Sequence, residues 1–153
     1  MEPTIVSYDE FLVMGVQVTG VPMQLDYASI WANRYMPFDA QLVALRADEA
    51  YYGAYFWTGE GEAMDFVAGV YVAPGTDPIP GVVLRKVPAA SYAKFSCTMG
   101  TLMQTWISAM KEWLPASGYE YDSAGAGWEY YVTGSNAPDA PVAVYVPVKP
   151  KAA

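Results

Sequence analysis

The most regular hydrophobic pattern in this chain is an apolar stripe with helical spacing in its second half. Apolar side chains recur at three- and four-residue steps, at Leu102, Met103, Trp106, Ile107, Met110, Trp113 and Leu114. Pro115 ends the pattern, so the spacing predicts a helix over about 102–114. A weaker stripe predicts a first helix over about 24–35, before Pro37.

Extended runs rich in valine and tyrosine precede and follow both predicted helices. The runs before the helices cover 5–19 and 82–98. The runs after them cover 42–47, 50–58 and 65–72 in the first half and 119–122, 128–133 and 142–148 in the second. Each half therefore reads strand–helix–strand–strand–strand, which is typical of an α+β protein.

The two halves look like copies of one unit. Val70-Tyr71-Val72-Ala73-Pro74 in the first half matches Val144-Tyr145-Val146-Pro147 in the second, at an offset of 74 residues between the tyrosines. Gly20 and Gly100, which follow the first run of each half, are 80 residues apart. The offset between matching positions of the two halves changes only from 80 to 74 residues along the chain, which favours a duplication.

We therefore predict one domain over 1–153, with repeat one at about 3–74 and repeat two at about 81–149. The predicted fold is α+β. It has two pseudo-symmetric strand-helix-strand-strand repeats, whose antiparallel sheets surround a central ligand cleft. Clefts between paired units are common sites of ligand binding.

Composition and charge exclude several classes of function. The chain has no histidine, which removes the usual general base and the commonest metal ligand, and Cys97 is its single cysteine. We therefore expect no metal, no other cofactor and no histidine-based triad. The net charge is −8 without a basic cluster, which argues against a nucleic-acid partner. No apolar run approaches the roughly 20 residues of a membrane span, and residues 1–20 lack the basic start of a signal peptide, so we expect a cytoplasmic protein.

Four stretches, taken in order, carry a resemblance to a known family. They are Val87-Pro88-Ala89-Ala90-Ser91-Tyr92-Ala93-Lys94-Phe95, Glu112-Trp113-Leu114-Pro115-Ala116-Ser117-Gly118-Tyr119, Trp128-Glu129-Tyr130-Tyr131 and Tyr145-Val146-Pro147-Val148-Lys149. The series resembles the GyrI-like small-molecule-binding family, also called the AraC effector-binding domain. The likeness covers nearly the whole chain, and the stretch that contains Trp-Leu-Pro-Ala-Ser-Gly-Tyr is its most specific part.

The resemblance implies two similar α+β repeats around a central pocket lined by aromatic rings. It also implies a pocket glutamate that meets cationic or polar parts of drug-like ligands, and Glu129 occupies the matching position. Many relatives carry a DNA-binding helix-turn-helix ahead of this domain, whereas residues 1–20 begin directly with the first predicted strand. The chain therefore resembles the stand-alone members, which are regarded as multidrug binders or sequesterers.

Three hypotheses for the function follow from the resemblance. The first, which we favour, is a binding protein for flat, lipophilic, often cationic aromatic compounds. The second is a hydrolase of cyclopropane-bearing, DNA-alkylating compounds, an activity of some stand-alone members, with Glu129 as general base and Tyr145 or Tyr55 as acid. The third is a protein-interaction role like that of the family's namesake, which inhibits DNA gyrase; no residue pattern here specifies that partner.

Strand alternation predicts which side chains accompany Glu129. Glu129 and Tyr131 fall on one face of their strand, and Trp128 and Tyr130 fall on the other. The alternative is that Glu129 lies on a solvated face. A buried glutamate without a cation nearby would have a raised pKa.

The first-repeat aromatic residue that opposes Glu129 depends on the offset between the repeats. An offset of 74 matches Tyr55 with Glu129, and an offset of 75, from Thr58 to Thr133, matches Ala54 instead. We choose Tyr55, with Trp57 as the second choice. The predicted ligand-binding residues are Glu129, Tyr131, Tyr145, Tyr55, Trp57 and Tyr92. The eight methionines are scattered along the chain, and we assign them to ordinary packing.

Overall fold

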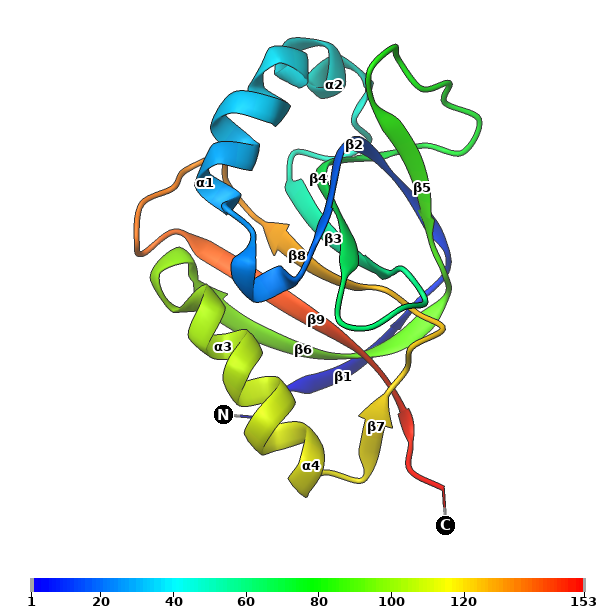
Figure 1. The fold of residues 1–153 in the computed structure, drawn as a ribbon, viewed down its shortest axis with the longest axis vertical. Helices are drawn as coiled ribbons and strands as arrows, with labels where there is room; N and C mark the ends of the chain where they lie inside the picture. Colours follow the sequence, from blue (N-terminus) through cyan, green and yellow to red (C-terminus); the bar gives the residue numbers. More distant parts are fainter. Residues whose placement is uncertain (1, 153) are drawn as a thin grey trace.

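The computed structural model describes residues 2–152. One antiparallel sheet runs through both halves of the chain, and two helical arms pack against it (Figure 1). The strands are β1 (Thr4–Tyr8), β2 (Phe11–Gly20), β3 (Tyr51–Trp57), β4 (Met64–Val72), β5 (Val83–Val87), β6 (Ala90–Thr98), β7 (Tyr119–Tyr121), β8 (Gly127–Tyr131) and β9 (Pro141–Pro150). The predicted α+β class is confirmed.

The helical arms have the same plan in both halves. The first arm consists of a 3-10 turn (Pro22–Gln24), α1 (Tyr27–Ser29), a π-helical turn (Ile30–Tyr35), another 3-10 turn (Met36–Phe38) and α2 (Asp39–Leu45). The second consists of a 3-10 turn (Met99–Thr101), α3 (Leu102–Ser108), a π-helical turn (Ala109–Trp113) and α4 (Leu114–Ala116). Each arm therefore contains a π-helical segment, an irregularity that is rare in general and frequent near functional sites.

The order of the strands in the sheet is symmetric about its centre. It is β1-β6-β9-β8-β3-β4-β2-β5, with β7 paired to β9 outside this path. β1 and β2 of the first half correspond to β5 and β6 of the second, and β3 and β4 correspond to β8 and β9. The central pair of β3 and β8 is therefore where the two halves meet.

The two ends of this sheet are joined by one ladder. β1 pairs with β6 and β2 pairs with β5, so each half lends its first strand to the other. The ladder runs from Thr4 opposite Lys94 to Gly15 opposite Val83, with the same register on both sides of the breaks at 9–10 and 88–89. The sheet therefore curls around the side chains on one of its faces.

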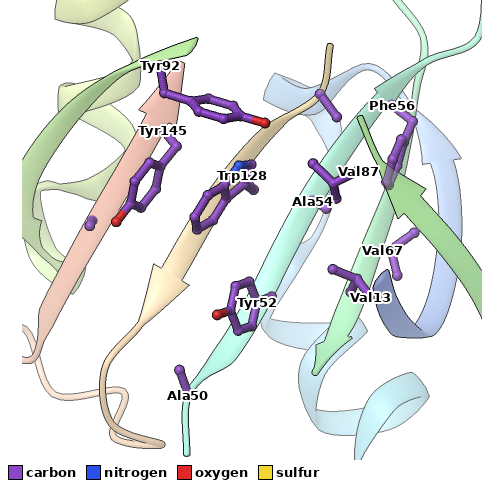
Figure 2. Packing of buried hydrophobic residues seen from close by; sticks show 12 residues of the cluster. Val13, Ala50, Tyr52, Ala54, Phe56, Val67, Val87, Tyr92, Trp128 and Tyr145 are labelled. Atoms are coloured by element: carbon purple, nitrogen blue, oxygen red, sulfur yellow. The ribbon is translucent and has the colours of Figure 1, made fainter. Parts of the chain in front are cut away.

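Those enclosed side chains form an aromatic core (Figure 2). The Trp128 and Tyr145 rings are stacked, with centroids 3.7 Å apart and an angle of 9° between the planes. Tyr8 of β1 and Phe11 of β2 both contact Trp128 edge-on, with centroid distances of 5.6 and 5.2 Å. Because β1 and β2 lie far apart in the strand order, these contacts confirm the curl.

The opposite face of the sheet carries two clusters, one under each arm, and Trp106 of the second arm packs against both. Ile30, Tyr35 and Leu42 of the first arm pack on β2 and β4, and Ala109 and Leu114 of the second arm pack on β6 and β9. Neither arm by itself covers the central pair of β3 and β8. The space above β3 and β8 therefore lies between the two arms.

The predicted strand at 42–47 is wrong. Pro37 lies in the first turn of the 3-10 segment Met36–Phe38, where a missing N–H group costs nothing, so the helical path continues through α2. Leu42 faces the core from this helix and is fully buried. Arg46 keeps a single antiparallel bridge to Val72, in the place where β7 pairs with β9 in the other half.

Close packing of β2 on β4 yields a prediction about stability. A Cβ atom on Gly15 would overlap the backbone carbonyl of Ala68, whereas one on Gly118 would meet nothing within 4 Å. We expect Gly15→Ala to lower the free energy of unfolding by about 3 kcal/mol and Gly118→Ala to change it by less than about 0.5 kcal/mol. Urea titrations followed by tryptophan fluorescence measure both, and equal values would contradict the packing described here.

Candidate functional site

A cavity of about 1340 Å³ lies between the two arms, above β3 and β8. Both repeats contribute to its wall. Its aromatic lining consists of Tyr27, Trp31, Tyr35, Tyr51, Tyr55, Trp57, Trp106, Tyr121 and Tyr131. Six of the eight methionines also line it, namely Met23, Met36, Met64, Met99, Met103 and Met110. The wall is thus a mixture of rigid rings and adaptable thioethers.

Glu129 projects from the floor of the cavity and is only 2% exposed. The register of the central pair sets Gly53 of β3 directly opposite Glu129 of β8. A Cβ atom at Gly53 would lie 3.1 Å from Oε1 of Glu129 and 2.8 Å from the Phe66 ring. The missing side chain at Gly53 is therefore what leaves room for the carboxylate at the joint between the repeats.

Three side chains donate hydrogen bonds to the carboxylate. The Tyr131 hydroxyl donates to Oε1 at 2.8 Å and the Tyr55 hydroxyl donates to the same oxygen at 3.1 Å. Trp106 Nε1 of α3 donates to Oε2 at 3.2 Å. Both strands of the central pair and the second arm thus fix the position of the carboxylate.

Burial raises the pKa of Glu129 to about 7, although the hydrogen bonds from Tyr131, Trp106 and Tyr55 lower it in part. Burial also raises the pKa of Tyr55 and of Tyr131 well above the usual range, and the nearby Glu129 charge adds to both shifts. Within residues 2–152, the ion pairs are Arg85–Asp65, Lys86–Glu10 and Lys149–Glu120, so no lysine or arginine neutralises Glu129.

Four of the six predicted ligand-binding residues line this cavity: Glu129, Tyr131, Tyr55 and Trp57. Tyr55 is the first-repeat residue that reaches Glu129, whereas Ala54 faces the enclosed core. Trp57 lies at the rim, is 48% exposed and donates from Nε1 to the Gly61 carbonyl.

Tyr145 and Tyr92 do not line the cavity, which corrects their grouping with Glu129. The register pairs Tyr145 with Trp128 and Val144 with Glu129, so Tyr145 projects from the other face of the sheet. Tyr92 belongs to the same enclosed core, where its ring contacts Trp128 and Tyr145 (Figure 2). Tyr145 instead borders a separate cavity of about 440 Å³.

Several residues of the site were missed in the sequence. The assignment of the methionines to ordinary packing is wrong for the six that line the cavity, because their common position is visible only once the arms are folded. Trp106 stood out only as part of the apolar stripe, and its spacing gives no sign of its bond to Glu129. Tyr27 and Trp31 carried no signal in the sequence that placed them in the site, whereas Tyr51 was expected in the wall that the first repeat contributes.

Other kinds of site find no support in the described part of the chain. Within 2–152, no group of three or more His, Cys, Asp or Glu side chains is placed to hold a metal ion. No helix in this range is long and apolar enough to cross a bilayer.

Comparison with known proteins identifies the family. Residues 1–149 match the GyrI-like small molecule binding domain. The chain belongs to this family. The GyrI-like domain is 29% identical, over 154 aligned residues, to the transcriptional regulator BrlR of Pseudomonas aeruginosa; the match covers 97% of the chain but 56% of BrlR. The chain therefore spans little more than half the length of this relative.

Solved structures share the fold of this GyrI-like domain. SAV2435, solved with tetraphenylphosphonium, has a TM-score of 0.79 and 16% identity, with 97% of this chain and 94% of that chain covered. The C-terminal domain of EcmrR has a TM-score of 0.72 and 16% identity, with 98% of each chain covered. At these identities the likeness concerns the fold.

The raised pKa of Glu129 predicts a pH-dependent stability for the ligand-free domain. The folded state holds the proton more tightly than the unfolded chain, so the stabilisation is complete below the ordinary carboxyl pKa and is lost as the pH rises through about 7. We expect Glu129→Gln to gain about 2 kcal/mol of unfolding free energy relative to the natural domain between about pH 5 and pH 8. Urea titrations at the two pH values test this. A difference between the two proteins that is independent of pH would contradict the shift.

Proposed function

We propose that this domain binds bulky, lipophilic aromatic cations in the cavity between its arms, with Glu129 as the counter-charge. One observation carries the proposal: a carboxylate that is 2% exposed, has no cationic partner among residues 2–152, and stands on the floor of an aromatic cavity. A buried charge of this kind is costly unless it is paired.

A ligand cation supplies the missing charge. A positive centre about 4 Å from the carboxylate gains on the order of 4 kcal/mol at an intermediate dielectric, before desolvation is counted. Faces of tyrosine and tryptophan rings add roughly 0.5–2 kcal/mol for each well-placed contact with a cation. The volume of about 1340 Å³ is sufficient for a ligand of several rings.

Two further points support a cationic ligand over a neutral or anionic one. The cavity wall carries three acidic residues, Asp39, Glu62 and Glu129, against one basic residue, Lys111. SAV2435, which shares the fold, was solved with tetraphenylphosphonium, an aromatic cation. The net charge of −8 adds a long-range attraction for cations and a repulsion for nucleic acid.

Replacement of Glu129 should weaken binding of a cation selectively. We expect Glu129→Gln to raise the Kd for tetraphenylphosphonium at least about tenfold at about pH 8, and to leave the Kd for the neutral triphenylphosphine oxide within about twofold. Isothermal titration calorimetry measures both. Tyr145→Phe is the control, because that hydroxyl lies on the opposite face and contacts only Tyr8, at 3.4 Å. Unchanged cation affinity in Glu129→Gln would remove the carboxylate from the proposal.

Hydrolysis of a strained electrophile is a second candidate, favoured by the raised pKa of Glu129. A carboxylate with a pKa of about 7 is well matched to general-base catalysis near neutral pH. The acid would be Tyr55 or Tyr131, whose hydroxyls lie within 3.1 Å of Glu129, and not Tyr145.

This second function predicts turnover of a cyclopropane-bearing alkylating compound, followed as ring-opened product by mass spectrometry. Product formation should be lost in Glu129→Gln, should fall at least about tenfold in Tyr55→Phe or Tyr131→Phe, and should persist in Tyr145→Phe. Absence of product with the natural domain would leave binding as the function.

A further inference from the structure

The cavity wall contains a second carboxylate, that of the half-buried Asp39, besides Glu129. Asp39 is the first residue of α2 and lines the cavity. It accepts a hydrogen bond from the Tyr51 hydroxyl at 3.3 Å. Like Glu129, it takes part in none of the ion pairs formed within residues 2–152. The cavity thus offers two carboxylates, neither of which forms an ion pair with a lysine or arginine in that range.

A continuous aromatic wall connects the two carboxylates. Tyr51 lies directly opposite Tyr131 across the central strand pair, and Tyr131 in turn donates to Glu129. The Trp31 ring contacts both tyrosines edge-on, with centroid distances of 6.3 and 5.5 Å. Glu129 lies opposite Gly53, which is two residues from Tyr51 along β3. The backbone positions at the two ends of this wall are therefore about 7 Å apart along the strand.

Near Asp39, the aromatic wall contains a tyrosine hydroxyl that forms no hydrogen bond with residues 2–152. Tyr35 lines the cavity, is 1% exposed, and its hydroxyl has no hydrogen-bond partner. Burial raises the pKa of Tyr35 most, the nearby Asp39 carboxylate and Tyr51 raise it further, and Arg46 lowers it in part. A buried hydroxyl that lacks a well-formed hydrogen bond is destabilising unless a partner is provided.

We propose that Asp39, with Tyr35 and Tyr51, forms a second cation subsite, and that the preferred ligands are elongated aromatic dications. One cationic centre meets Glu129 and the other meets Asp39, while the aromatic body lies along Trp31 and Tyr131. This inference rests on the proposed function, since the first charge is the one assigned there to Glu129.

Two basic residues lie near this subsite; the positive charge of Arg46 lowers the pKa of both Tyr35 and Tyr51 in part, and neither Arg46 nor Lys111 forms an ion pair with Asp39. Arg46 stands over the Tyr51 ring, with its guanidinium carbon 5.5 Å from the centroid, and donates to the Glu49 carbonyl. It does not line the cavity. Lys111 lines the cavity from the second arm, is exposed, and forms no ion pair with Asp39. A ligand cation can therefore approach Asp39 from the cavity without displacing either residue from a carboxylate.

A matched pair of probes tests the subsite. The dication is an alkane with a triphenylphosphonium group at each end, in a series of increasing chain length, and the monocation is an alkyltriphenylphosphonium of the same chain length. We expect the best dication to bind at least about tenfold more tightly than its monocation, with a maximum at one chain length. We expect Asp39→Asn to reduce this ratio to about one, while the Kd of the monocation changes by less than about threefold. Calorimetric titrations at about pH 8 measure all four values.

Two control variants distinguish a local site from a general attraction of cations. Glu62→Gln removes the same charge from another part of the cavity wall and should leave the ratio unchanged. Tyr35→Phe removes the hydroxyl alone and should lower the ratio in part. Equal affinity of dication and monocation for the natural domain, or an equal loss in Asp39→Asn and Glu62→Gln, would overturn the subsite. If the monocation itself does not bind, it is the proposed function that fails.

Discussion

A single carboxylate buried without a cation at the joint of two repeats is the constraint on which the rest of this structure depends. Ionised Glu129 needs donors, and it receives them from Tyr131, Tyr55 and Trp106. These hydrogen bonds reduce the free-energy cost of burying the Glu129 charge but do not remove it, because the pKa of Glu129 still lies at about 7. A domain that keeps such a group gives up stability at neutral pH, and under the proposed function a bound cation restores it. In that proposal, the instability of the empty site and the affinity for a cation are two effects of the same charge.

The duplication explains why there is one such charge and why it is central. The strand order is symmetric about β3 and β8, so facing positions on these two strands lie nearest to the pseudo-two-fold axis. Two glutamates at facing positions would place like charges side by side, and one of them would be neutralised by protonation. Glycine at Gly53 avoids this and also avoids the Phe66 ring. The repeats have thus kept their backbone in common and differ where the ligand is proposed to bind.

Local patterns in the sequence were sufficient for the strands other than the one expected at 42–47, for the second helix and for the face that carries Glu129 and Tyr131, since each depends on periodicity within one element. They were not sufficient where the outcome depends on register between elements. Tyr145 was grouped with Glu129 because the two lie on neighbouring strands, but a register that pairs Tyr145 with Trp128 turns it to the other face. The six cavity methionines and Trp106 come together only through the docking of the arms. The helical path through α2 was lost because Pro37 was interpreted as an end, although a proline is well tolerated in a first turn.

The aromatic rings on the two faces of the sheet are packed differently. Inside the curl, rings from distant strands pack on one another, as in the stack of Trp128 on Tyr145 at 3.7 Å, and the separate cavity of about 440 Å³ lies beside them. On the outer face, each arm packs mainly on the apolar cluster of its own half, while Tyr27, Trp31 and Trp106 of the arms reach the rings of the central pair. The rings above β3 and β8 are therefore packed against the arms and also line the cavity. The cavity at the joint is thus a consequence of packing the two arms on different parts of the sheet, and under the proposed function the polar groups that line it decide which ligand binds.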